Sequence, residues 1–135
     1  MKKVEAVAGI IICNNEILCM KRSNSKYNYI AYKYEFPGGK IEVGESPKAA
    51  LQRELNEEID LDVPQGKMTF FMTVKHDYPD FTVQLHAYLC QVEHKEIKMK
   101  EHEAFSWSKP DYLTSFDWLE GDWPIIESLR SRLDV

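Results

Sequence analysis

The sequence predicts one domain of the α+β class, extending over residues 1–135. Several apolar stretches rich in β-branched residues are bounded by turn formers, as is typical of strands. One glutamate-rich segment near the middle repeats its apolar residues with the period of a helix. A chain of 135 residues is the size of one ordinary domain and can bury a core without disulfides or a structural metal.

Strands are predicted first. Residues 4–13 and 17–20 are apolar, and Asn14-Asn15 between them tolerates positive φ, so we expect a hairpin. Residues 33–36 are a short strand candidate. The Pro-Gly-Gly segment at 37–39 is predicted to be a turn, because proline removes a hydrogen-bond donor and glycine allows unusual φ.

The glutamate-rich segment is predicted to be an amphipathic helix that ends at Ile59. Ser46 suits the N-cap position, and Pro47 suits the first helical position. The apolar residues of this helix recur every four positions and comprise Leu51, Leu55 and Ile59. We expect them to dock the helix on the core.

The second half of the chain continues in the same way. Residues 67–76 and 81–92 read as two strands joined by a turn at Asp-Tyr-Pro-Asp, and residues 104–107 as a short strand. Residues 111–116 and 124–133 are predicted to form two short helices. The sequence contains no repeat or linker, so we expect all these elements to share one domain.

The net charge and the N-terminal segment argue against nucleic acid and membrane partners. Its net charge is −5, and its lysines and arginines form no dense cluster, so we expect no nucleic acid polymer as a partner. The N-terminal basic pair precedes an apolar run that is short and interrupted by Glu5, which indicates a strand. We therefore expect no signal peptide, membrane span or membrane partner.

The cysteines indicate a reducing compartment. Cys13, Cys19 and Cys90 are an odd number, include no CxxC pair, and lie within apolar strand-like segments. We interpret them as reduced and buried, which predicts a cytoplasmic protein.

The predicted helix gathers acidic residues on one side. Glu54, Glu57 and Glu58 fall at i, i+3 and i+4, so their side chains project together. Glu57 has Arg53 four residues away, but neither Glu54 nor Glu58 has a lysine or arginine at that spacing. One interpretation is a solvated charged face. The other is a site for a divalent cation, and oxygen ligands favour Mg²⁺ or Mn²⁺ over Zn²⁺.

The preceding glycine segment favours the metal interpretation. Bare backbone at 37–39 can approach the helix, where a carbonyl can ligate an ion and N–H groups can receive phosphate oxygens. Lys40 and Arg53 add positive charge that can hold a polyphosphate or orient a glutamate. The segment is not a P-loop, because Ile41 stands where that motif needs serine or threonine.

These residues resemble the Nudix box, Gly-x5-Glu-x7-Arg-Glu-aliphatic-x-Glu-Glu-x-Gly-aliphatic. Over residues 39–61 the pattern is occupied at the correct spacings by Gly39, Glu45, Arg53, Glu54, Leu55, Glu57, Glu58 and Leu61. Asp60 departs from it, because the family has glycine there. A helix exit favours left-handed geometry, which costs aspartate about 1 kcal/mol relative to glycine, so we expect an effect on stability more than on chemistry.

The resemblance implies an α/β/α sandwich around a mixed β-sheet, and the hydrolysis of a nucleoside diphosphate linked to another group. The stretch EFPGGKIEVGES is most similar to the MutT-type branch, which converts nucleoside triphosphates to a monophosphate and pyrophosphate. The implied metal ligands are the carbonyl of Gly38 and the carboxylates of Glu54, Glu57, Glu58 and Glu101. Arg53 and Glu45 are expected to steady the glutamates. Either Glu54 or Glu101 is expected to take the proton from the attacking water.

Three further assignments follow from the resemblance, and the aromatic Phe36 is a fourth candidate. Arg22 ends the second strand, where the branch has a phosphate-contacting arginine. Glu101 matches the position of a further catalytic carboxylate, with Glu103 as the alternative, and His102 between them is interpreted as a loop residue. Asp122 is expected either to read the base or to be a solvent-facing cap of the last helix. Phe36 is expected either to stack on the base or to pack in the core.

The sequence thus predicts a Mg²⁺-dependent nucleoside triphosphate pyrophosphohydrolase that acts on a free small-molecule nucleotide, as a monomer or a homodimer. The substrate is expected to be an oxidised or modified deoxynucleotide such as 8-oxo-dGTP, or a pyrimidine nucleotide such as CTP or dCTP. One alternative is a pyrophosphatase of ADP-ribose or nucleotide sugars. A second, from another class, is a nucleotide sensor that binds without cleavage.

Overall fold

Strands make up much of residues 2–133, the part of the chain that the computed structural model describes. The strands are β1 (Lys2–Cys13), β2 (Glu16–Lys21), β3 (Tyr34–Glu35), β4 (Gly38–Lys40), β5 (Met68–Asp77), β6 (Phe81–Gln91) and β7 (Ala104–Ser108). The α-helices are α1 (Pro47–Ile59) and α2 (Trp123–Leu133). Short 3₁₀ helices occur at Gln65–Lys67, Pro110–Ser115 and Glu120–Asp122.

The sheet is built around the long strand β1. Along its length β1 pairs in parallel with β6, and on its other side it pairs antiparallel with β4 and then with β2. The strand order is β3-β2-β1-β6-β5, with β7 added to β2. The other pairings between the named strands are antiparallel, so the sheet is mixed, as predicted.

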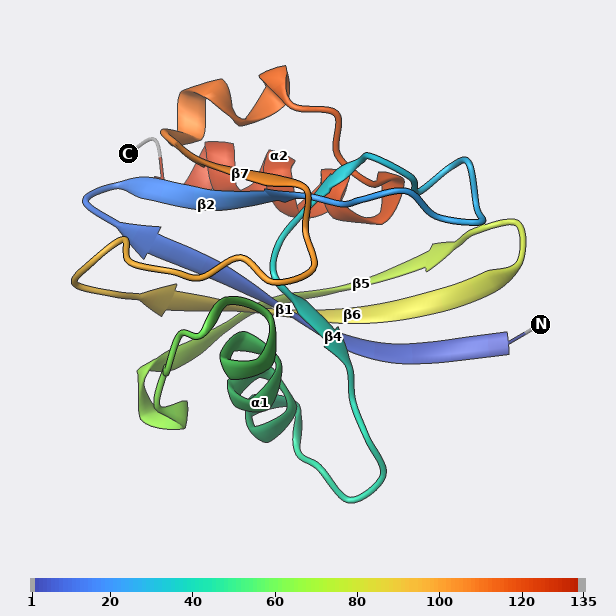
Figure 1. The fold of residues 1–135 in the computed structure, drawn as a ribbon, viewed down its shortest axis with the longest axis horizontal. Coiled ribbons are helices and arrows are strands. Elements are labelled where there is room, and N and C mark those ends of the chain that lie inside the picture. The colour runs from blue at the N-terminus through green and yellow to red at the C-terminus, as the bar shows by residue number, and fades with distance from the viewer. Residues whose placement is uncertain (1, 134–135) are drawn as a thin grey trace.

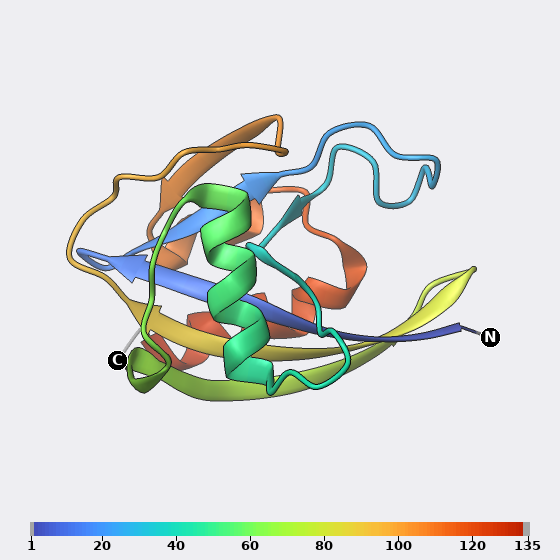
Figure 2. The same ribbon diagram turned by 60° about the horizontal axis from the view of Figure 1, so that its bottom comes forward.

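Alternation along β1 gives the sheet two apolar faces. Val7 and Ile11 face α1, whereas Ala8 and Ile10 face α2, because neighbouring side chains on a strand point to opposite sides. Helices α1 and α2 cover opposite faces of the sheet (Figures 1 and 2). The predicted α+β class and α/β/α sandwich are therefore confirmed.

Helix α1 forms where the sequence predicts it. The Ser46 hydroxyl accepts a hydrogen bond from the Ala49 N–H at 3.2 Å, with Pro47 at the first helical position. The predicted apolar stripe of Leu51, Leu55 and Ile59 is fully buried. Asp60 ends the helix in the left-handed conformation, with φ 55° and ψ 39°, and its N–H donates to the Asn56 carbonyl.

The prediction of a turn at 37–39 was wrong. Residues Gly38–Lys40 form strand β4, which pairs with Ala8 to Ala6 of β1. Glycine is needed at position 38 because an added Cβ would lie 2.0 Å from the Val7 carbonyl oxygen. The glycines predicted a turn because glycine allows unusual φ. In the structure, Gly38 is needed because strands β4 and β1 approach each other closely.

Smaller differences concern element types. The strand expected at 33–36 is limited to Tyr34–Glu35, and the helix expected at 111–116 is a 3₁₀ helix at Pro110–Ser115. The hairpin at Asn14 and Asn15 is confirmed, and both residues have positive φ. The cysteines are buried free thiols, as predicted. Within residues 2–133, no helix combines the length and apolar character needed to cross a membrane.

Candidate active site

A cleft of about 630 Å³ lies beside β1 and β4 and extends from α1 to the 3₁₀ turn before α2. Carboxylates line one end of it: Glu54 and Glu58 of α1, and Glu101 from the segment before β7. The walls farther along are apolar and come from β1 and β6, and Asp122 lies among the lining residues. The cleft therefore joins an acidic region to an apolar one.

The two glutamates of α1 that line the cleft lie where burial disfavours the ionised carboxylate. Burial raises the pKa of Glu58 to about 8, with the neighbouring charge of Glu35 adding to the effect. A hydrogen bond from the Gly38 N–H, at 3.0 Å, opposes this shift. Burial also raises the pKa of Glu54. Glu57, by contrast, has a side chain that is 60% exposed.

Arg53 joins the acids of the predicted motif into one network. Its Nε and Nη2 donate to the two carboxylate oxygens of Glu45, at 2.7 and 2.9 Å. Its Nη1 donates to Glu54 at 2.8 Å and to Glu57 at 3.2 Å. The hydrogen bonds from Arg53 lower the pKa of Glu45 to about 2. Glu45 thus fixes Arg53, and Arg53 orients the glutamates.

Strand β4 runs against the Glu54 carboxylate. A Cβ added to Gly39 would lie 2.5 Å from Glu54 Cδ, so the backbone at this position must stay bare. Lys40 follows, is exposed and also lines the cleft. The structure therefore brings β4 and the carboxylates of α1 together, as the glycine pattern indicated.

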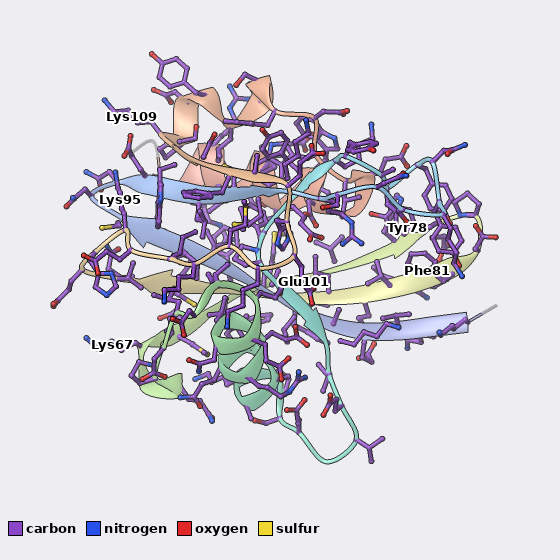
Figure 3. The ribbon with its side chains drawn as sticks, viewed as in Figure 1. Lys67, Tyr78, Phe81, Lys95, Glu101 and Lys109 are labelled. Carbon is purple, nitrogen blue, oxygen red and sulfur yellow. The ribbon has the colours of Figure 1, made fainter. Side chains whose placement is uncertain are left out.

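Glu101 lies on the acidic side of the cleft, close enough for its charge to raise the pKa of both Glu54 and Glu58. In Figure 3 it lies next to α1 and β4. The alternative residue, Glu103, pairs with Lys21 at 3.4 Å and does not line the cleft.

Two residues of the site were missed from the sequence. His102, interpreted as a loop residue, has a side chain that is 5% exposed, and its Nε2 lies 2.8 Å from Glu35 Oε2 and 3.9 Å from Glu58 Oε2. Glu35 also accepts a hydrogen bond from Arg22 Nη1 at 3.0 Å. Spacing along the chain could not reveal this contact, because 67 residues separate Glu35 from His102.

The remaining predicted residues divide between the cleft and the core. Arg22 lines the cleft, and its Nε is buried without a hydrogen-bond partner in residues 2–133. Phe36 lines the cleft but is only 3% exposed, and its ring centroid lies 4.8 Å from that of Trp118, in the core on the α2 side. Asp122 is 4% exposed, and burial raises its pKa well above the ordinary value. Asp122 is thus no solvent-facing cap.

Comparison with known proteins assigns the family. Residues 3–129 match the family described as NUDIX domain. The chain belongs to the Nudix family. It is 35% identical to an 8-oxo-dGTP diphosphatase of Escherichia coli K12, over 96% of this chain and 98% of that protein. It is 30% identical to a CTP pyrophosphohydrolase of the same organism, over 97% and 94%. The solution structure of the E. coli ORF135 protein matches with a TM-score of 0.82 and 29% identity, covering 97% and 91%.

The acidic end of this Nudix cleft fits divalent cations. Glu54, Glu58 and Glu101 crowd one region, and two of them have raised pKa values, so a cation there would relieve an unfavourable concentration of negative charge. Oxygen donors suit a hard ion. Ligand atoms of Glu35, Glu58 and His102 also lie within 4.8 Å of one another. In that cluster, however, both oxygens of Glu35 already accept hydrogen bonds, from Arg22 and His102.

Proposed function

We propose that this Nudix hydrolase uses Mg²⁺ to convert a nucleoside triphosphate to the monophosphate and pyrophosphate. The observation that carries the proposal is the placement of half-buried Glu54 and buried Glu58 on the lining of a nucleotide-sized cleft, with Arg53 holding Glu54. Two relatives named as nucleotide diphosphatases or pyrophosphohydrolases, similar over nearly their whole length, support it.

The proposed metal ligands are the residues that the resemblance to the family implies: the Gly38 carbonyl, Glu54, Glu57, Glu58 and Glu101. The metal, Mg²⁺ or alternatively Mn²⁺, supplies charge neutralisation at the phosphates and activation of water. Arg53 and Glu45 keep the carboxylates in place. Glu54 or Glu101 accepts the proton of the attacking water, since both lie on the cleft wall.

Arg22 and Lys40 are the proposed phosphate contacts. Both are basic residues that line the same cleft as the carboxylates. The unpartnered Nε of Arg22 leaves a donor for a phosphate oxygen. The nucleoside then extends toward the apolar walls, where Asp122 reads the base and Phe36 supplies the edge of an aromatic ring.

Two groups of base are candidates, an oxidised or modified purine deoxynucleotide such as 8-oxo-dGTP and a pyrimidine nucleotide such as CTP or dCTP. They correspond to the names of the two relatives. The first substrate would place the enzyme in nucleotide-pool sanitation, and the second in pyrimidine nucleotide turnover. We propose that it acts on free nucleotides in the cytoplasm, as a monomer or homodimer.

A panel of nucleotides with Mg²⁺ tests the proposal. It contains the ordinary ribo- and deoxynucleoside triphosphates, 8-oxo-dGTP, 5-substituted dCTPs, ADP-ribose and nucleotide sugars. We expect one triphosphate to yield monophosphate and pyrophosphate far faster than the others. Preferential cleavage of ADP-ribose or a nucleotide sugar would contradict the proposed substrate class. Binding of nucleotides without any cleavage would indicate a sensor.

A further inference from the structure

Glu35 contacts both Arg22 and His102. Its Oε1 accepts a hydrogen bond from Arg22 Nη1 at 3.0 Å, and its Oε2 lies 2.8 Å from His102 Nε2. Since a carboxylate can only accept, His102 Nε2 is the donor in this contact. The Glu35 side chain is largely buried, and its charge raises the pKa of Glu58. One carboxylate thus fixes a cleft arginine and the residue next to Glu101.

His102 is an inward-pointing residue in an outward-facing segment. Its neighbours Lys100, Glu101 and Glu103 are exposed, whereas the His102 side chain is 5% exposed. Backbone bonds attach the segment on both sides: the Lys100 N–H donates to the Glu58 carbonyl at 3.2 Å, and the Glu103 N–H donates to a β2 carbonyl at 2.8 Å. His102 is the side-chain anchor between these two points.

Glu101 needs such an anchor. Within residues 2–133, no hydrogen bond or ion pair holds its side chain, and only its backbone carbonyl is bound, by the Ser23 hydroxyl at 3.1 Å. After burial, the charge of Glu101 also contributes to the raised pKa of Glu54 and of Glu58, so these carboxylates repel one another. A carboxylate that is repelled by its neighbours stays beside them only if its backbone is held there.

We propose that His102, through its hydrogen bond to Glu35, is a positioning residue that keeps Glu101 beside the carboxylates of α1. The inference rests on the proposed function, since it assigns Glu101 to the metal-binding end of the cleft. In this arrangement Nε2 of His102 is committed to Glu35 and is not free to ligate a metal.

The test compares His102→Ala and His102→Gln with Glu103→Gln as the matched control. Glu103→Gln removes a carboxylate from the same segment but outside the cleft. We expect His102→Ala to lower kcat about 10–100-fold with KM changed less than about threefold, in the range typical of residues that orient metal ligands. Glutamine retains an N–H donor, so His102→Gln should recover part of the loss. Glu103→Gln should behave like the wild type.

Combining His102→Ala with Glu101→Gln shows whether His102 acts through Glu101 or independently of it. If His102 acts by holding Glu101, His102→Ala should add little to the loss that Glu101→Gln already causes. Losses that multiply in the double variant would overturn the proposal, because they would show that His102 acts elsewhere. Wild-type kcat in His102→Ala would overturn it as well.

Binding of Mn²⁺, followed by electron paramagnetic resonance without nucleotide, gives a readout that does not need the substrate. We expect His102→Ala and Glu101→Gln to weaken Mn²⁺ binding to similar extents, whether or not the panel identifies a substrate. Loss of a Mn²⁺ site in His102→Ala that Glu101→Gln retains would overturn the proposal and make His102 a ligand. If His102→Ala does not fold, Glu35→Gln replaces it, and unchanged Mn²⁺ affinity in that variant contradicts the proposal.

Discussion

Arg53 and Glu45 form a two-pronged pair in which Nε and Nη2 of the arginine donate to the two oxygens of the glutamate, at 2.7 and 2.9 Å. The third guanidinium nitrogen, Nη1, reaches Glu54 at 2.8 Å. Because guanidinium is planar, fixing one edge of the fork fixes the other. The position of Glu54 in the cleft therefore depends on a residue in the loop before α1.

Arg53→Lys tests this dependence. Lysine keeps the charge but has one ammonium group in place of the fork, so it cannot bind Glu45 at two points and Glu54 at the same time. We expect kcat to fall about 10–100-fold with a small change in KM. Arg130→Lys on the exposed side of α2 is the control and should leave kcat unchanged. Full activity of Arg53→Lys would show that charge alone is needed.

Gly39→Ala tests the close approach of β4 and α1. The new Cβ would lie 2.5 Å from Glu54 Cδ, so the carboxylate has to move. We expect a loss of activity of about tenfold or more, because small displacements of a metal ligand are costly. Gly66→Ala is the matched control, since no atom lies within 4 Å of the added Cβ. Equal activity of the two variants, measured under saturating substrate, would refute the steric account.

The raised pKa of Glu58 predicts how stability varies with pH. The ordinary pKa is 4.5 and the value in the folded protein is about 8. Between these values the folded state binds the proton and the unfolded state does not, so the free energy of unfolding of the metal-free protein should fall as pH rises. Thermal melts between pH 5 and 8 measure this slope.

Mg²⁺ should reverse part of that loss. Metal binding requires the ionised carboxylate, so Mg²⁺ should raise Tm more at pH 8 than at pH 5. Glu58→Gln should flatten the pH dependence of the metal-free protein and reduce the stabilisation by Mg²⁺. Glu127→Gln, on the exposed side of α2, should do neither. An increase of Tm by Mg²⁺ that is the same at both pH values would be evidence against proton-linked binding at Glu58.

Asp60 gives a prediction about stability alone. It adopts φ 55° at the end of α1, a conformation that glycine reaches without steric cost. We expect Asp60→Gly to increase the free energy of unfolding by about 0.5–1 kcal/mol and to leave kcat unchanged. Asp60→Ala, which keeps a Cβ and loses the tolerant side chain, should be destabilised in denaturant melts. The opposite order of the two variants would refute the conformational argument.

The sequence was most informative where local rules decide structure. The N-cap at Ser46, the apolar stripe of α1 and the turn at Asn14-Asn15 depend on neighbouring residues, and all three were predicted correctly. The alignment of glutamates on α1 follows from helix periodicity in the same way. For these elements, short-range spacing is sufficient information.

Contacts between segments that are distant in the sequence could not be predicted from short-range spacing. Strand β4 exists because Gly38 and Gly39 lie against β1 and α1, and no local pattern distinguishes that from a turn. The contact of His102 with Glu35 depends on the pairing of β7 with β2, which delivers the preceding segment to the cleft. The burial of Asp122 likewise depends on how the 3₁₀ turn before α2 packs.

The most direct test of the account is the product formed from the preferred triphosphate in Mg²⁺, compared with EDTA, by wild-type protein and by Glu58→Gln. Phosphorus NMR distinguishes pyrophosphate from inorganic phosphate in one spectrum. We expect the wild type to release monophosphate and pyrophosphate only with Mg²⁺, and folded Glu58→Gln to be at least about 100-fold slower, since it lacks a metal-binding carboxylate. Equal rates with EDTA, or undiminished cleavage by Glu58→Gln, would contradict a metal-dependent reaction at the carboxylates of α1.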